Sequence, residues 1–218
     1  MLYIVATPIG NLSDMSLRAL NILAEVDCIL AEDTRVTGVL LKHFKLSKPL
    51  QSVREQTPDS VLAGLIDRME QGEAMAFVSD AGTPAISDPG GKLVELAHHA
   101  GVKVVPIPGP SAVTAALSVA GFPASEFVFL GYFPKKKGRQ TLARALKSEK
   151  RTVVLFETGP RITKTLELLR TELGGEREIV ICRELTKIYE EVIRVKLQEV
   201  PTLTEKGEFV LVLGPLKN

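Results

Sequence analysis

The chain has 218 residues, 45% of them hydrophobic, which is enough to bury a sizeable core in one large domain or two small ones. Its 27 basic and 26 acidic residues nearly balance, so no overall positive charge indicates a nucleic-acid partner. No run of about 18 apolar residues is present, and the N-terminus lacks a basic start and a cleavage site, so we expect no membrane span and no signal peptide.

The first half alternates short apolar runs with amphipathic stretches. Strands are predicted over residues 2–6, 28–31, 74–79 and 102–107. Helices are predicted over residues 16–26, from Ser60 to just before Gly72, and from an Asp88 N-cap with Pro89 as the first helical residue to Gly101. This βαβα order favours a mostly parallel sheet with helices on its faces.

A run of prolines around Gly109 interrupts this order, and we place a domain boundary there, between residues 1–110 and 111–218. The second half is predicted to contain helices over 111–119, 139–148 and 161–173. Its strands are expected over 127–130, 152–156, 179–182, 191–197 and 209–213. The later strands follow one another closely, which favours a mixed sheet with antiparallel members. The fold class is therefore α/β, with two domains whose sheets are each flanked by helices.

The two cysteines, Cys28 and Cys182, each lie in an apolar, strand-like run. We expect both to be buried, reduced thiols of a cytoplasmic protein. Neither they nor the three histidines have the spacing of metal ligands, so no metal is expected.

Four loops rich in glycine, proline and small polar residues follow the four predicted strands of the first half, at residues 7–14, 32–35, 80–90 and 108–112. Because open α/β sheets bind ligands at the carboxyl ends of their strands, the loops are predicted to form one backbone-lined cleft. Taken singly, each loop is more typical of a turn. Asp80 alone is consistent with a turn cap, and Asp33 with Arg35 is consistent with a local ion pair.

Several common site motifs are missing. No G-x-G-x-x-G and no G-x-x-x-x-G-K-[ST] is present, so a dinucleotide or a nucleoside triphosphate is not favoured. Ser79 and Ser111 lack the G-x-S-x-G context of a hydrolase nucleophile.

Residues 135–151 carry eight basic side chains and one acidic one, Glu149. Such clustering binds phosphate backbones even in a nearly neutral chain, although a solvated loop and helix face is the alternative. A second charged set, over residues 183–191, fits either a site or a surface ion network.

Several blocks of this chain resemble, in order, the motif series of the ribosomal RNA small-subunit methyltransferase I family, a branch of the tetrapyrrole-methylase superfamily (class III methyltransferases). The blocks are VATPIGNLSDMSLRAL, AEDTR, VSDAGTPAISDPG, PIPGPSA, LGYFPKKKGR, FETGPR, CRELTKIYEE and GEFVLVL. PGPSA alone is only moderately specific, whereas AEDTR together with VSDAGTPAISDPG is highly specific.

The resemblance implies 2′-O-methylation of a cytidine in the 16S rRNA of the small ribosomal subunit. It implies two α/β domains with S-adenosylmethionine between them, and a homodimer. Carried over by position, the donor contacts should be Pro8, Ile9, Asp80, Gly82, Thr83, Ser111 and Ala112, with Leu185 as a further one.

Methyl transfer to a hydroxyl needs a base, and the candidates are Asp33 and Glu184, with Arg35 and Lys187 fixing phosphate or aligning the ribose. Lys135, Lys136, Lys137 and Arg139 are the candidate RNA contacts. The alternatives are methylation of a tetrapyrrole and a non-catalytic ribosome-assembly factor on the same fold.

The chain departs from the family pattern at its C-terminus. Members usually carry a further segment, whereas this chain stops at Asn218, so a short member and a truncated one are both open.

Overall fold

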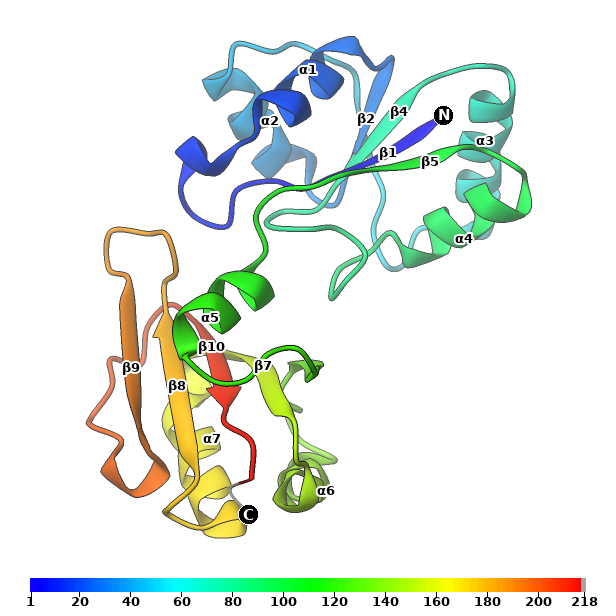
Figure 1. The fold of residues 1–218 in the computed structure, drawn as a ribbon. Coiled ribbons are helices and arrows are strands. Elements are labelled where there is room, and N and C mark those ends of the chain that lie inside the picture. The colour runs from blue at the N-terminus through cyan, green and yellow to red at the C-terminus, as the bar shows by residue number, and fades with distance from the viewer. Residues whose placement is uncertain (217–218) are drawn as a thin grey trace. The chain divides into compact units, whose positions relative to one another are not determined.

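The computed structural model describes residues 1–216, which fall into two compact units, one over Met1–Ser111 and one that starts at Ala112 (Figure 1). Each unit contains a five-stranded sheet of its own. No helix among residues 1–216 is both long and apolar enough to cross a membrane.

The sheet of the first unit is entirely parallel, as predicted, with strand order β3-β2-β4-β1-β5. Its strands are β1 (Leu2–Val5), β2 (Cys28–Ala31), β3 (Leu50–Ser52), β4 (Met75–Val78) and β5 (Val104–Ile107). Every residue of β2 and β4 is buried. This is typical of parallel strands that are covered by helices on both faces.

Four helices cover the two faces of this sheet, namely α1 (Leu17–Glu25), α2 (Thr34–His43), α3 (Asp59–Glu70) and α4 (Gly91–His99). A short 3₁₀ turn, η1 (Leu12–Asp14), precedes α1. Apolar side chains of α1 and α2 pack with Ile29 and Val78 in one core cluster. Those of α3 and α4 pack with Leu30 and Phe77 in another, because alternate residues of a strand point to opposite faces (Figure 1).

The predicted start of the fourth helix was wrong. Asp88 is not its N-cap and Pro89 is not its first helical residue, because α4 begins at Gly91 with Gly90 as N-cap. Gly90 has a φ of 125°, and a Cβ there would lie 2.3 Å from the Phe77 ring, so a glycine is required where the loop meets the core. The sequence analysis did not predict two elements, the helix α2 and the strand β3. The α2 sequence contains Gly38 and several β-branched residues, which lower its predicted helix propensity.

The second unit has a mixed sheet of order β6-β7-β10-β8-β9, in which β6 and β7 are parallel and the other pairs antiparallel, as predicted. Its strands are β6 (Phe127–Tyr132), β7 (Thr152–Thr158), β8 (Glu178–Arg183), β9 (Glu191–Lys196) and β10 (Glu208–Leu213). Its helices are α5 (Ala112–Ala120), α6 (Arg139–Ala145) and α7 (Gly159–Leu173), with 3₁₀ turns η2 (Leu146–Ser148) and η3 (Leu197–Glu199).

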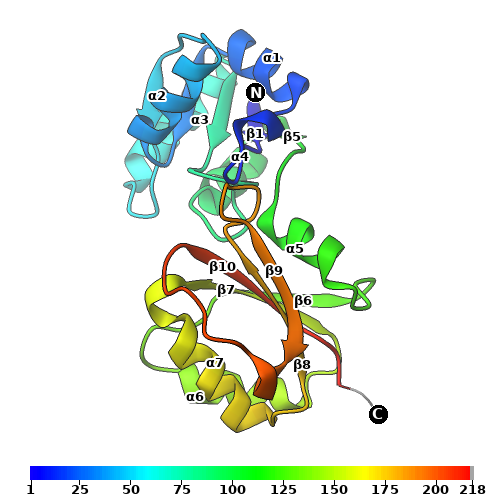
Figure 2. The ribbon, with the colours of Figure 1, turned by 90° about the vertical axis from the view of Figure 1, so that its left-hand side faces the viewer.

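The helices of this unit lie on opposite faces of its sheet (Figure 2). Side chains of α6 and α7 pack with Leu155 and Leu211, whereas those of α5 pack with Val154 and Val212. Cys28 in the first unit and Cys182 in the second are both free and buried, as predicted.

Candidate functional site

The carboxyl ends of β1, β2, β4 and β5 bring the four predicted loops to one edge of the first unit. Because the strands are parallel and adjacent in the order β2-β4-β1-β5, the loops that follow them meet there. Thr7 and Gly82 exchange two backbone hydrogen bonds, of 2.9 and 3.1 Å, which join the first loop to the third. The Thr83 hydroxyl donates to the Pro110 carbonyl over 3.1 Å, which joins the third loop to the fourth.

The second loop is joined to the third through carboxylates. The backbone N–H of Asp33 donates to Oδ1 of Asp80 over 3.1 Å, and the N–H of Asp80 donates to Oε2 of Glu32 over 3.3 Å. All four loops are therefore held by direct hydrogen bonds.

Two glycines set how closely the backbone can approach at this edge. Gly82 has a φ of 83°, and a Cβ there would lie 3.3 Å from Cγ2 of Ile9. A Cβ on Gly109 would lie 3.0 Å from that of Ala6. Both positions leave room for backbone groups and little room for side chains.

This edge of the first unit, at the carboxyl ends of its strands, is the strand-end edge. A pocket of about 580 Å³, the strand-end pocket, opens there. It is lined by Glu32, Asp33, Arg54, Glu55, Gln56, Asp80, Ile86, Ser87, Asp88 and Pro89. Asp80 and Asp33 are thus brought together as expected. Glu32, Arg54 and Asp88 were missed. Glu32 lies inside the motif block AEDTR and Asp88 inside VSDAGTPAISDPG, so the sequence blocks could have indicated both as site residues. Arg54 lies in none of the blocks, so no sequence signal pointed to it.

Three carboxyls of this pocket have protein atoms close around them, although Asp80 is exposed by its accessible surface while Glu32 and Asp88 are half-buried. The resulting loss of hydration raises the pKa of Glu32, of Asp80 and of Asp88 above the ordinary range. Such groups hold a proton more readily than a free carboxyl does, and they gain from a cationic or hydrogen-bond-donating ligand.

Asp33 behaves differently, although it lines the same pocket. Its carboxylate caps α2 by accepting from the Arg35 N–H at 2.9 Å, and it pairs with the Arg35 guanidinium at 2.5 Å. Hydrogen bonds from Arg35 hold the pKa of Asp33 well below its usual range. The Arg35 side chain is 86% exposed.

The other predicted donor contacts fall in both units. In the first unit Pro8 is buried and Ile9, Thr83 and Ser111 are half-buried, all in the joined loops. Ala112 begins α5 in the second unit, where Ala112 and Leu185 pack against the same apolar cluster.

Glu184 and Lys187 lie in the second unit, in the loop between β8 and β9. Nζ of Lys187 pairs with Oε1 of Glu184 at 2.9 Å and with Oε2 of Glu208 at 2.8 Å. Burial would raise the pKa of Glu184, but hydrogen bonds from Lys187 and from the Glu208 N–H outweigh it and hold this pKa below the usual value. Glu184 and Thr186 have φ values of 49° and 67°, so the backbone of this loop is strained.

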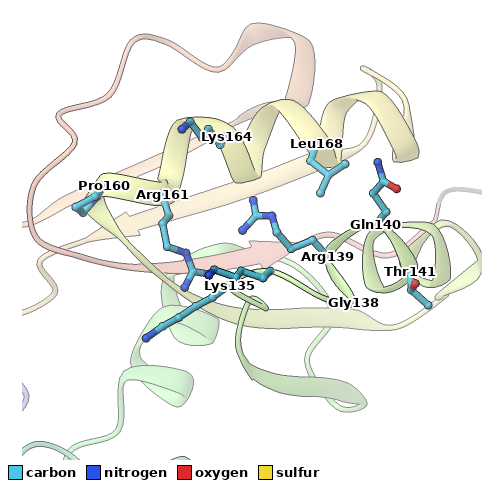
Figure 3. Close-up of a pocket in the computed structure, with 10 residues that line it drawn as sticks. Lys135, Gly138, Arg139, Gln140, Thr141, Pro160, Arg161, Lys164 and Leu168 are labelled. Atoms are coloured by element: carbon cyan, nitrogen blue, oxygen red, sulfur yellow. The ribbon is translucent and has the colours of Figure 1, made fainter.

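The predicted RNA contacts separate into two sets. Lys135, Lys136 and Arg139 line a second pocket, in the second unit, whereas Lys137 does not (Figure 3).

Among residues 1–216, no group of three or more His, Cys, Asp or Glu side chains is arranged to hold a metal ion.

A family model described as Tetrapyrrole (Corrin/Porphyrin) Methylases matches residues 1–201 of this chain. A Thermotoga maritima protein named ribosomal RNA small subunit methyltransferase I is 46% identical over 217 residues, which are 98% of this chain and 97% of that protein. A Xylella fastidiosa protein of the same name is 46% identical over 219 residues, 97% of this chain and 80% of that protein. The crystal structure of the methyltransferase CobJ matches with a TM-score of 0.70 at 18% identity, over 98% of this chain and 93% of that one, which shows a shared fold.

Proposed function

The chain belongs to the tetrapyrrole methylase family and to its branch of ribosomal RNA small subunit methyltransferases I, and we propose that it methylates the 2′-hydroxyl of a cytidine in 16S rRNA, with S-adenosylmethionine as the donor. The observation that carries this proposal is the identity of 46% over 98% of the chain to a protein of that name. The joined loops of the first unit and the basic pocket of the second supply chemistry that fits a small donor and an anionic acceptor.

We propose that the donor is held by Pro8, Ile9, Asp80, Gly82, Thr83, Ser111, Ala112 and Leu185. The residues fit such a group, because Gly82 and Gly109 keep side chains away from the backbone at the joined loops. Asp80 offers a carboxylate whose pKa is raised by partial loss of hydration, and a polar or cationic partner would stabilise its charged form. When bound, S-adenosylmethionine supplies an electrophilic methyl group on a positively charged sulfur.

The residues of the chain then have two tasks, which are to align the 2′-oxygen and to accept its proton. Asp33 and Glu184 were the candidate bases, but hydrogen bonds lower the pKa of both, which makes them weak proton acceptors. Glu32 and Asp88 are better matched, because burial raises their pKa and they line the strand-end pocket. We assign Asp33 to holding Arg35, and Arg35 and Lys187 to contacts with phosphate or ribose.

We also propose that the protein works as a homodimer in the cytoplasm, on the small ribosomal subunit. Light scattering on the purified chain tests the homodimer, since a mass of one chain would contradict it.

The function is tested by transfer of tritium from labelled S-adenosylmethionine into small ribosomal subunits that lack the modification, followed by nuclease mapping. Fully modified subunits are the matched control. We expect label in one 2′-O-methylcytidine of the unmodified subunits and none in the control. Absence of label, with donor binding retained, would contradict the proposal, and tetrapyrroles would be the next acceptors to test.

A further inference from the structure

The basic pocket of the second unit has a volume of about 680 Å³. It is lined by Lys135, Lys136, Gly138, Arg139, Gln140, Thr141, Pro160, Arg161, Lys164 and Leu168, which come from the loop before α6, from α6 itself and from the first turns of α7 (Figure 3). Five of these ten residues are cationic and none is acidic. Arg161 and Lys164 lie outside the basic segment 135–151, so the pocket joins two separate stretches of the chain.

The positive charge of the pocket is only partly neutralised. Lys135, Lys136 and Lys164 are exposed, and none of them forms an ion pair or hydrogen bond with any residue of the range 1–216. Exposed lysines that lack an acidic neighbour attract anions from solution.

The two arginines of the pocket, Arg139 and Arg161, are instead held by hydrogen bonds within the second unit. Glu157 is buried, and its Oε2 accepts from Arg161 at 3.0 Å and from the Thr165 hydroxyl at 2.6 Å. The Thr165 oxygen in turn accepts from Arg139 at 3.0 Å, and the Arg139 guanidinium lies 5.0 Å from the centre of the Phe133 ring. Arg139 also donates to the Pro134 carbonyl at 3.0 Å, and Arg161 donates to the Phe133 carbonyl. Glu157, Thr165 and two backbone carbonyls thus fix both guanidinium groups before any ligand arrives, which lowers the entropy cost of binding.

The first turn of α7 is already satisfied by the protein. Thr158 provides no side-chain cap, but the N–H of Gly159 donates to the Gly207 carbonyl at 2.9 Å and the N–H of Thr158 donates to Oε1 of Glu157 at 2.8 Å. The positive charge of the pocket therefore comes from its side chains. The buried Nε of Arg161 also lacks a hydrogen-bond partner among residues 1–216, which leaves one donor of this network unsatisfied.

We propose that this pocket is a phosphate clamp, which binds a backbone phosphodiester of the ribosomal RNA at a point separate from the strand-end edge of the first unit. The inference rests on the proposed function for the identity of the RNA. Fixed arginines match the geometry of phosphate oxygens, and free lysines add point charges around them. Lys137 does not line the pocket, so the clamp uses only part of the lysine run and adds Arg161 and Lys164 to it.

The test is binding of an unmodified transcript of 16S rRNA, measured over a range of salt concentrations. The variant is Lys135→Gln with Lys164→Gln, which are both exposed and line the pocket from the loop before α6 and from α7. We expect affinity to fall about tenfold at low salt, and the slope of log affinity against log salt to become shallower by about 1.5. Lys135→Arg with Lys164→Arg should restore both values, because the charge is kept.

The matched control is Lys147→Gln with Lys150→Gln, which removes two exposed lysines of the same basic segment outside the pocket. It should lose much less affinity. Equal losses in the two Gln variants would overturn the clamp in favour of a diffuse basic surface, and an unchanged slope in the pocket variant would overturn it outright. Methyl transfer by the unaltered protein is measured in parallel. If the unaltered protein transfers methyl groups but the pocket variant keeps the same salt slope, only the clamp is contradicted. If the pocket variant has a shallower salt slope but the unaltered protein transfers no methyl group, only the proposed function is contradicted.

Discussion

The strand-end edge of the first unit and the phosphate clamp of the second present opposite charges. At the edge, hydrogen bonds that each involve a backbone group join the loops, and the pocket contains carboxyls whose pKa is raised by burial. In the clamp, Arg139 and Arg161 bond to backbone carbonyls and to a side-chain network around the buried Glu157, and the pocket presents five cations.

The difference matches two kinds of ligand. A small, positively charged donor fits a site of backbone groups and carboxylates, whereas an extended polyanion fits a site of cations. Methyl transfer to RNA requires both kinds of binding at once, and this chain carries a carboxyl-lined pocket in the first unit and a cation-lined pocket in the second. The substitutions at Glu157 and Asp80 that follow are each chosen to break one of these pockets and to spare the other.

The largest effect is expected at Glu157. Replacing it with alanine leaves the partly buried Arg161 without its anion and removes an acceptor of Thr165. The free energy of unfolding of the second unit should fall by about 3–5 kcal/mol, because breaking a buried ion pair strands a charge. Urea denaturation measures this loss, with Glu167→Ala on the exposed side of α7 as the control. A loss below about 1 kcal/mol would mean that the network does not hold the clamp together.

The next effect is expected at Asp80. Asp80→Asn keeps the shape of the side chain and an acceptor for the Asp33 N–H, and removes only the negative charge. Donor affinity, measured by calorimetry, should fall about 10- to 100-fold, which is the usual loss for a charge-assisted hydrogen bond. Asp67→Asn, at an exposed position of α3, should leave it unchanged. Equal donor affinity in all three proteins would remove Asp80 from the donor site.

A smaller effect is expected from pH. Because burial raises the pKa of Asp80, its carboxylate takes up a proton at a higher pH than an ordinary aspartate, and donor affinity should weaken as the pH falls through that value. The same raised pKa favours folding at low pH, a contribution lost as the pH rises through the folded value, so protonation of Asp80 does not itself unfold the protein. The lowered pKa of Asp33 acts in the opposite sense, so folding is followed separately. Donor titrations across the acidic range, with circular dichroism beside them, check this. In Asp80→Asn, donor affinity should depend less on pH. An equally steep pH profile in that variant would mean that another group causes the pH dependence.

The smallest effect is expected at the thiols. Burial raises the pKa of Cys28, and it raises the pKa of Cys182 to about 11. Neither thiol should react with a disulfide reagent at about pH 8 while its unit is folded, because both access and thiolate are lacking. Since each unit holds one cysteine, Cys28→Ser and Cys182→Ser make each thiol a reporter of its own unit. In the Glu157→Ala background, Cys182 should become reactive and Cys28 should not, and faster labelling of Cys28 alone would contradict that.

The contrast between the two sites also explains what could be predicted from the sequence. The strand-end loops depend on local turn chemistry, such as the positive φ of Gly82, and local chemistry leaves motifs in the sequence. The parallel sheet and the mixed sheet were predictable from the spacing of apolar runs. The order of the strands was not, because it depends on pairings between residues far apart in the chain.

The clamp was only half predictable. Lys135, Lys136 and Arg139 stand in a visible charge run, but Arg161 and Lys164 join them only because α7 follows β7 and packs beside α6. Glu157 and Arg161 both lie in the FETGPR block, but the block does not show that Glu157 holds Arg161 and, through Thr165, Arg139. The wrong start of α4 has a similar cause, because contact with Phe77 requires Gly90 at the cap and overrides the local preference for Asp88-Pro89.

The central claim is that the donor and the RNA are bound by separate parts of this chain during one reaction. Steady-state methyl transfer to unmodified small subunits tests it most directly, with Asp80→Asn compared with the double variant Lys135→Gln and Lys164→Gln. We predict that the first raises KM for S-adenosylmethionine alone and that the second raises KM for the subunit alone. If both variants change the same constant, or if the unaltered protein transfers no methyl group, the account is contradicted.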